Sequence, residues 1–128
     1  MKVLSAILCD EVRKEDTGKL LFIGVYTSDI LVKHFPTPAV NLAFWLHLGP
    51  LGKNKINMAL RIYEQSHPKL HIYSGNGTIS IQDRDRDVFV TLPISIANIP
   101  GPTTLLFDIK IDNSRWKKVY GIKVEHPQ

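Results

Sequence analysis

The sequence predicts an all-β fold, an antiparallel β-sandwich of the immunoglobulin-like or C2-like kind with about eight strands. Apolar and polar residues alternate with a period of two over most of the chain, and Gly, Pro, Asn or Asp interrupts the alternation roughly every 8–14 residues. No window of about ten residues combines a helical period with caps, so we expect at most one short helical turn. The 128 residues, 44% of them hydrophobic and 22% charged, suit a single domain over residues 1–128.

The N-terminal region predicts a β-hairpin. Residues 3–9 are an apolar run that indicates a buried first strand, and Asp16-Thr17-Gly18 supplies turn residues before a second strand over residues 19–26. Phe35-Pro36, followed by Thr37-Pro38, then interrupts the chain, because proline has no amide proton to donate to a ladder.

Five further strands follow from the alternation alone. They cover residues 40–48, 56–64, 88–96, 107–112 and 116–124. Each has one apolar face and one wetter face, as strands of antiparallel sheets do. Residues 49–54 predict a loop, and Asn76-Gly77 predicts a two-residue hairpin because both positions tolerate a positive φ. Pro100-Gly101-Pro102 closes the strand that ends near Ile96.

The net charge of +4 identifies no partner. Each half of the chain carries eight basic and six acidic residues, so no basic arm or face stands out and the sequence argues against a nucleic-acid binder. In the densest basic stretch, basic residues are interspersed with aromatic ones. Aromatic side chains beside cations can stack on nucleic-acid bases, but we favour the simpler interpretation that this stretch is a solvated strand face. This stretch comprises Arg115, Trp116, Lys117, Lys118, Tyr120 and Lys123.

Cys9 is the only cysteine, so no intrachain disulfide forms and nothing indicates an oxidising compartment. The apolar run before Cys9 is too short for a signal peptide and is stopped by Asp10 and Glu11, which favours a cytoplasmic protein. No stretch is long enough to span a bilayer. Asp10 beside Cys9 disfavours a reactive thiolate, so we interpret Cys9 as a small core residue and keep a thiol enzyme as a minor alternative.

Two charged segments are candidate sites. Glu11, Arg13 and Glu15 are spaced by two, which in a strand places them on one face where the arginine can bridge both acids. We take them as a candidate binding patch, with a hairpin stabilised by ion pairs as the simpler interpretation.

The second segment alternates acids with arginines, and its carboxylates Asp83, Asp85 and Asp87 would share one side of an extended chain. Three such oxygens are a candidate Ca²⁺ site, although the EF-hand pattern is absent and a charged loop or edge strand is the simpler interpretation. A zinc site formed by His47, His67 and His71 is less favoured, because Pro68 argues against the helix that the spacing of the last two would need.

The opening of the chain resembles a known family. The residues concerned are Cys9-Asp10-Glu11-Val12-Arg13-Lys14-Glu15, then Gly18-Lys19, Ile23-Gly24-Val25-Tyr26, the pair Phe35-Pro36, and later Ile99-Pro100-Gly101. They are similar to the motifs of a family of small bacterial proteins known only as a domain of unknown function. The resemblance implies a bacterial or phage source and a β-sandwich, and it implies no catalytic residues.

The sequence therefore favours a non-enzymatic interaction module without a cofactor, which binds a protein partner or a second copy of itself. The absence of any recognisable catalytic spacing supports this interpretation. Trp45, Tyr63 and Tyr73 fall on faces that the alternation leaves outside the core, where aromatic residues suit an interface. The alternatives are a Ca²⁺-dependent binding module and the thiol enzyme.

Overall fold

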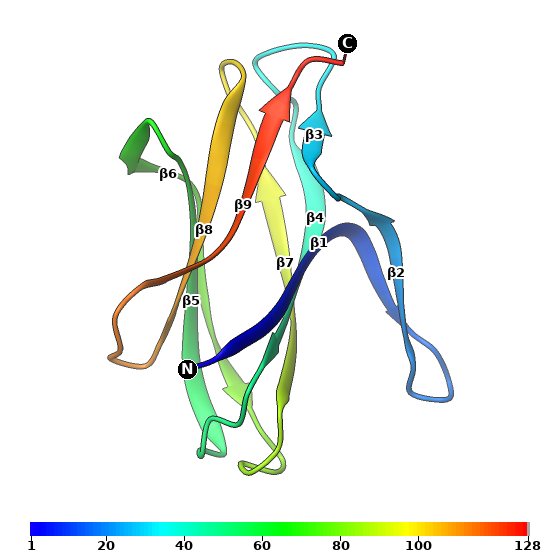
Figure 1. The fold of residues 1–128 in the computed structure, drawn as a ribbon, viewed down its shortest axis with the longest axis vertical. Coiled ribbons are helices and arrows are strands. Elements are labelled where there is room, and N and C mark those ends of the chain that lie inside the picture. The colour runs from blue at the N-terminus through cyan, green and yellow to red at the C-terminus, as the bar shows by residue number, and fades with distance from the viewer. Residues whose placement is uncertain (128) are drawn as a thin grey trace.

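The computed structural model describes residues 1–127, which form two β-sheets packed face to face (Figure 1). One sheet has four strands in the order β2-β1-β4-β7, and the other has five in the order β3-β9-β8-β5-β6. The strands are β1 (Val3–Lys14), β2 (Leu20–Val25), β3 (Asp29–Leu31), β4 (Val40–Leu48), β5 (Lys55–Glu64), β6 (His67–Ser80), β7 (Val88–Ile96), β8 (Thr103–Ile111) and β9 (Lys117–Glu125).

The core lies between the two sheets. At its centre the ring of Phe44 from β4 packs 4.8 Å from that of Phe107 and 5.5 Å from that of Tyr120, measured between centroids. Alternate residues of each strand supply the rest, so that Leu42, Leu46 and Leu48 are buried beside Phe44. The period-two pattern thus puts one face of every long strand into a shared apolar layer, as in other sandwiches.

The chain crosses between the sheets after β2. The three residues of β3 join the five-stranded sheet and run parallel to β9, with Asp29 opposite Lys123 and Leu31 opposite Glu125. Residues 32–39 then return to the four-stranded sheet, where β4 begins. Figure 1 shows β3 beside β9, while β2 stands away from both on the far side of β1. Residues of this crossing, together with residues of β4, β7 and β9, line a pocket between the two sheets.

The predicted fold class is confirmed: the described part is all-β, in two sheets without a helix. The predicted strands at residues 40–48 and 88–96 have the same bounds as β4 and β7, and the others are displaced by a few residues at their ends. Residues 1–127 accordingly contain no helix long and apolar enough to cross a bilayer.

Two features differ from the predictions. Residues 1–127 form nine strands, and the additional one is the three-residue β3, which is too short to show an alternation. The hairpin predicted at Asn76-Gly77 is wrong: both residues lie inside β6, opposite Ala59 and Met58 of β5, and the turn is instead formed by residues 65–66. Continued pairing with β5 overrides the local preference, since Gly77 does not adopt a positive φ.

Candidate functional site

Strand β2 is an edge strand made of uncharged residues only. It pairs with β1 on one side, and its other backbone edge has no partner strand among residues 1–127. Four of its six residues, Leu20, Leu21, Ile23 and Val25, are 36–47% exposed. An exposed apolar edge strand presents unpaired N–H and C=O groups together with apolar side chains, which is the combination that another strand can bind.

The other three edges each carry a feature that discourages strand pairing. Pro93 lies in the middle of β7, and its carbonyl already accepts a hydrogen bond of 3.2 Å from the Tyr73 hydroxyl. Strand β6 contains Pro68, followed by Lys69. Strand β3 has only three residues, one of them Asp29. Among the four edge strands in the described chain, β2 alone contains neither a proline nor a charged residue.

Gly24 shapes the β1–β2 hairpin near its end. Its φ is +67°, and a Cβ at this position would collide with the carboxylate of Asp10 on β1. Glycine is the residue that adopts this conformation without a steric cost. Gly24 therefore lets β2 approach the Asp10 carboxylate closely, and Tyr26, two residues on, lines the pocket between the sheets and donates its hydroxyl to Asp10.

The predicted patch Glu11–Arg13–Glu15 lies next to β2. Arg13 Nε is 3.0 Å from Glu11 Oε1, both side chains being largely exposed, and this hydrogen bond raises the pKa of Arg13. Glu11 is opposite Ile23 and Arg13 is opposite Leu21, so the pair flanks the apolar residues of β2. Glu15 lies in the turn, where its backbone bonds to Lys19 and Gly18. In the described structure the ion pair of Arg13 is with Glu11 and does not extend to Glu15.

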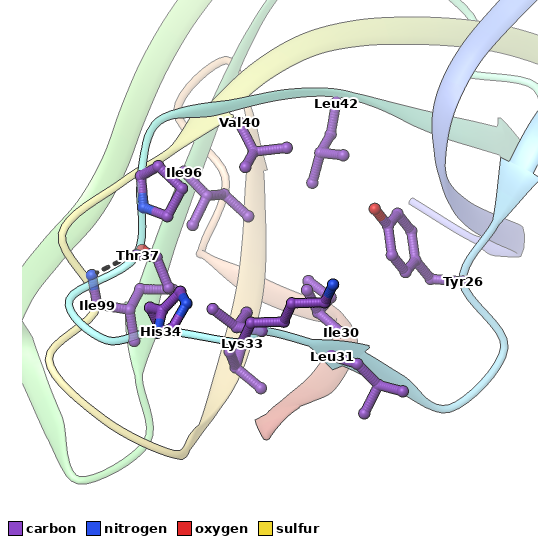
Figure 2. A pocket seen from close by; sticks show the side chains of 13 residues that line it. Tyr26, Ile30, Leu31, Lys33, His34, Thr37, Val40, Leu42, Ile96 and Ile99 are labelled. Carbon is purple, nitrogen blue, oxygen red and sulfur yellow. Dashed lines mark hydrogen bonds between the residues drawn. The ribbon is translucent and has the colours of Figure 1, made fainter. Parts of the chain in front are cut away.

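A pocket of about 300 Å³ opens in the gap between the sheets, at the end of β2 (Figure 2). Its apolar lining comes from β3, β4, β7 and β9 and from the loop after β7. The residues that line it are Tyr26, Ile30, Leu31, Val32, Lys33, His34, Thr37, Pro38, Val40, Leu42, Ile96, Ile99 and Val124. Leu31 and Val40, which also line the pocket, are exposed to solvent.

Hydrogen bonds fix the segment that forms the pocket rim. The amide of the buried Thr37 donates to the Ile99 carbonyl at 3.0 Å, its Oγ1 accepts from the Ile99 amide at 3.0 Å, and its carbonyl accepts from the Asn98 amide at 2.9 Å. At the other end, the amide of Val32 donates to the carbonyl of Glu125 at 2.8 Å. The pocket is thus preformed, as small-ligand sites usually are.

Four polar side chains line the pocket, namely Thr37, whose hydroxyl is bonded to Ile99, and Tyr26, Lys33 and His34. The Tyr26 hydroxyl donates a hydrogen bond of 2.9 Å to Asp10 Oδ1. Burial, reinforced by this bond and by the negative charge of Asp10, raises the pKa of Tyr26 to about 12, so the phenol is neutral at physiological pH. In Figure 2 the side chain of Lys33 extends from the rim towards Tyr26. No carboxylate of residues 1–127 lies within ion-pairing distance of its ammonium.

The structure gives the carboxylates of the predicted Ca²⁺ site separate partners. Asp83 accepts a hydrogen bond from the Asp85 amide at 3.0 Å and lies 3.4 Å from Arg86 Nε, while Asp87 bonds to His47 Nε2 at 2.8 Å. The segment is a turn between β6 and β7 rather than an extended chain. Residues 1–127 contain no cluster of three Asp, Glu, His or Cys side chains suited to a metal. The Ca²⁺ site stays a prediction.

Cys9 is fully buried, and its thiol lies 3.4 Å from the Glu11 carbonyl and 3.7 Å from that of Ala43. Burial raises the pKa of Cys9, and Asp10 raises it further, so the thiolate is disfavoured. Trp45 lies on the face of β4 opposite Phe44, as the alternation indicates, but it is covered by Phe22 at 5.1 Å and Phe89 at 5.9 Å.

The pocket was not predicted from the sequence. Its walls come from residues that are up to about a hundred positions apart, such as Tyr26 and Val124, and only the fold brings them together. One sequence signal for the neighbouring edge was available: residues 20–25 form a six-residue segment without any charge, just after the highly charged residues 10–19.

Comparison with known proteins gives a family and a distant structural likeness. No curated protein matches the chain. Among solved structures, the sensor domain of the anti-sigma factor RsgI4 from Pseudobacteroides cellulosolvens is similar at a TM-score of 0.44 and 15% identity. The match covers 77% of this chain and 93% of that one. A likeness of this size carries no inference about activity.

The sequence resemblance to a family without an assigned activity is confirmed by a family model, DUF6941, which matches residues 4–125. The chain belongs to this family of unknown function.

Proposed function

We propose that this chain is a protein-interaction module that binds an extended segment of a polypeptide by adding it to the edge of β2. The observation that carries the proposal is the uncharged, exposed Leu20–Val25 strand with a free backbone edge. Backbone hydrogen bonds to the edge supply affinity in strand addition, and side chains at alternate positions supply specificity.

The distribution of exposed apolar residues supports this choice of surface. Six large hydrophobic residues with more than a third of their area exposed fall between positions 20 and 40, and four others lie elsewhere. The first group is Leu20, Leu21, Ile23, Val25, Leu31 and Val40; the second is Met1, Leu4, Leu70 and Phe89. Four of the ten lie within the six residues of β2, and a cluster of exposed apolar side chains marks an interaction surface.

A role in binding rather than catalysis agrees with the side chains at this surface. The candidate nucleophile Cys9 is buried with a raised pKa, and the pKa of the Tyr26 hydroxyl that bonds to Asp10 beside β2 is raised as well, so neither group is activated as a nucleophile. We further propose that the protein works in the cytoplasm, where a single buried thiol stays reduced.

The test compares two lysine substitutions at exposed apolar positions. Immobilised wild-type chain, Ile23→Lys and Leu70→Lys are used to capture partners from the native host, and the size of each purified chain is measured by light scattering. Because a charge at Ile23 disrupts the β2 edge, we expect Ile23→Lys to lose a partner that wild type and Leu70→Lys both retain.

Leu70 is the matched control, since it is exposed by 66% and lies on β6, at the opposite end of the other sheet. If wild type self-associates and Ile23→Lys does not, the added strand comes from a second copy of the chain. A monomeric wild type whose captured proteins are the same as those of Ile23→Lys would overturn the proposal.

A further inference from the structure

The pocket beside β2 combines apolar walls with a single cation at its opening. Ile96, Ile99, Leu42 and Val124 are buried and form its interior. Lys33 approaches from the rim, and its ammonium has no carboxylate partner among residues 1–127 (Figure 2). We infer that the pocket binds a small free carboxylic acid with a linear apolar body, whose chain lies between the sheets and whose carboxylate pairs with Lys33.

The charge distribution favours an anionic head group over a neutral or cationic one. Besides Lys33, the ionisable side chains that line the pocket are His34 and Tyr26. Three acids neighbour residues that line the pocket: Asp10, which is bonded to the Tyr26 hydroxyl at 2.9 Å, Asp29 beside Ile30 on β3, and Glu125 beside Val124 on β9. None of the three forms an ion pair with Lys33 in the described chain. A carboxylate at the mouth would gain a charge-assisted hydrogen bond from the ammonium, which is stronger than a bond between neutral groups.

The size of the pocket sets the length of the apolar body. Its volume of about 300 Å³ corresponds to about ten non-hydrogen atoms at roughly 30 Å³ each, the volume that a water molecule takes in the liquid. Octanoate, with eight carbons and two oxygens, has that number. Pockets of this kind, mostly apolar with a few polar groups that orient the ligand, are typical of small-molecule sites.

The inference is independent of strand addition to β2, although the two surfaces adjoin. The walls of the pocket come from β3, β4, β7 and β9, none of which the β2 substitutions alter. The variant Ile23→Lys should therefore bind the acid as wild type does, which separates a failure of this inference from a failure of the proposed function.

The test is titration calorimetry with a homologous series of sodium carboxylates from butanoate to dodecanoate, below their micelle concentrations. We expect the affinity to rise about threefold to fourfold per added methylene up to octanoate, because each buried methylene contributes a fixed free energy, and to stop rising beyond it. Octanol and octylamine at the same concentrations should bind at least about tenfold more weakly than octanoate.

Two variants locate the site. Lys33→Met should weaken octanoate about tenfold while leaving octanol unchanged, and Lys33→Arg should retain most of the affinity. Val40→Trp should fill the mouth and abolish binding, with Leu70→Trp as its control at an exposed site away from the pocket. Circular dichroism confirms that each variant is folded.

No heat with octanoate would overturn the inference, as would an affinity independent of chain length or equal binding of octylamine. An unchanged affinity of Lys33→Met would also overturn it. A last experiment measures binding to vesicles that contain anionic lipid. Binding to these vesicles without binding to free octanoate would show that the pocket mouth recognises a membrane surface, and the inference would be wrong.

Discussion

Two nitrogens of Arg61 lie against one carboxylate oxygen of Asp108, with Nε at 3.0 Å and Nη2 at 2.9 Å from Oδ2. The other oxygen of Asp108 accepts a hydrogen bond of 3.2 Å from the Tyr63 hydroxyl. Asp108 is only 4% exposed, and the indole of Trp116 covers the guanidinium at 4.2 Å. The buried carboxylate of Asp108 is thus neutralised by Arg61 on the outer face of the five-stranded sheet, away from β2.

Removal of the guanidinium should destabilise the protein strongly. In Arg61→Met the buried carboxylate of Asp108 loses its counter-charge, and we expect a loss of about 3 kcal/mol in the free energy of unfolding, at the lower end for buried pairs because Arg61 is partly exposed. Urea denaturation measures the loss. Lys110→Met, which also removes a cation near Trp116 but no ion pair, is the control. Equal stability of the two variants would show that Asp108 does not need Arg61.

Tyr26 should make the protein sensitive to alkaline pH. Its pKa is raised to about 12 in the folded chain from an ordinary value of 10.0, so the folded state binds more protons than the unfolded state between these values. The contribution of Tyr26 to the free energy of unfolding is therefore fully present below pH 10 and is lost as the pH rises towards 12.

Denaturation of Tyr26→Phe at several pH values should show a smaller loss over that range than wild type. Tyr63 and Tyr120, whose pKa values are also raised, stay in both proteins and act as the common background. Asp10→Asn should lower the pKa of Tyr26 without bringing it fully to 10, because burial is the largest cause of the shift. The absorbance of tyrosinate follows both titrations.

The thiol of Cys9 should react only when the chain opens. Its side chain is fully buried and its pKa is raised by burial, so alkylation by iodoacetamide needs a conformational opening that exposes it. We expect native alkylation to be at least about a hundredfold slower than in denaturant, as measured by mass spectrometry. Rapid alkylation of the native protein would revive the thiol-enzyme hypothesis.

Substitution of Gly24 should disturb the edge strand. Gly24→Ala introduces a side chain at a φ of +67° and into contact with the Asp10 carboxylate. The left-handed conformation alone costs about 1–2 kcal/mol for an L-residue. The same substitution at Gly77, where a Cβ meets no atom within 4 Å and φ is not positive, should cost less. Thermal unfolding of the two variants makes the comparison, and equal melting temperatures would contradict it.

Calcium should leave thermal unfolding unchanged if the turn between β6 and β7 is structural. Asp83 and Asp87 already bond to Asp85, Arg86 and His47, so their oxygens are not directed at one point. Calorimetry with CaCl₂, with MgCl₂ as the control salt, measures this directly. Heat specific to CaCl₂ that Asp85→Asn abolishes would establish the Ca²⁺ module that the sequence suggested.

The long strands were predictable because one physical pattern specifies them. In β4, alternate residues from Leu42 to Leu48 must face the other sheet, and a shift by one residue would turn them all away from it. Asn76-Gly77 shows the limit of local signals. Its turn preference is real, but ten register pairs between β5 and β6 outweigh it.

The candidate site was predictable only in part. The hairpin that carries Glu11 and Arg13 follows from local residues, yet the exposure of Ile23 depends on β2 being an edge, which is decided by strand order. The pocket depends on the passage of the chain from β2 to β3, and three residues from Asp29 to Leu31 carry too little pattern to predict that crossing. The position of Lys33 at its mouth follows from the same crossing.

Trp45 provides an optical signal for events at the edge. Its Nε1 is buried without a hydrogen-bond partner in the described chain, and its ring lies in edge contact with Phe22 of β2. An indole in such surroundings fluoresces at short wavelength, and its emission moves to longer wavelength when water reaches the nitrogen. Trp116, stacked on Arg61 of the other sheet, contributes a constant background. The tryptophan spectrum of the unlabelled protein therefore reports whether the β1–β2 hairpin remains seated on β4 while a partner binds.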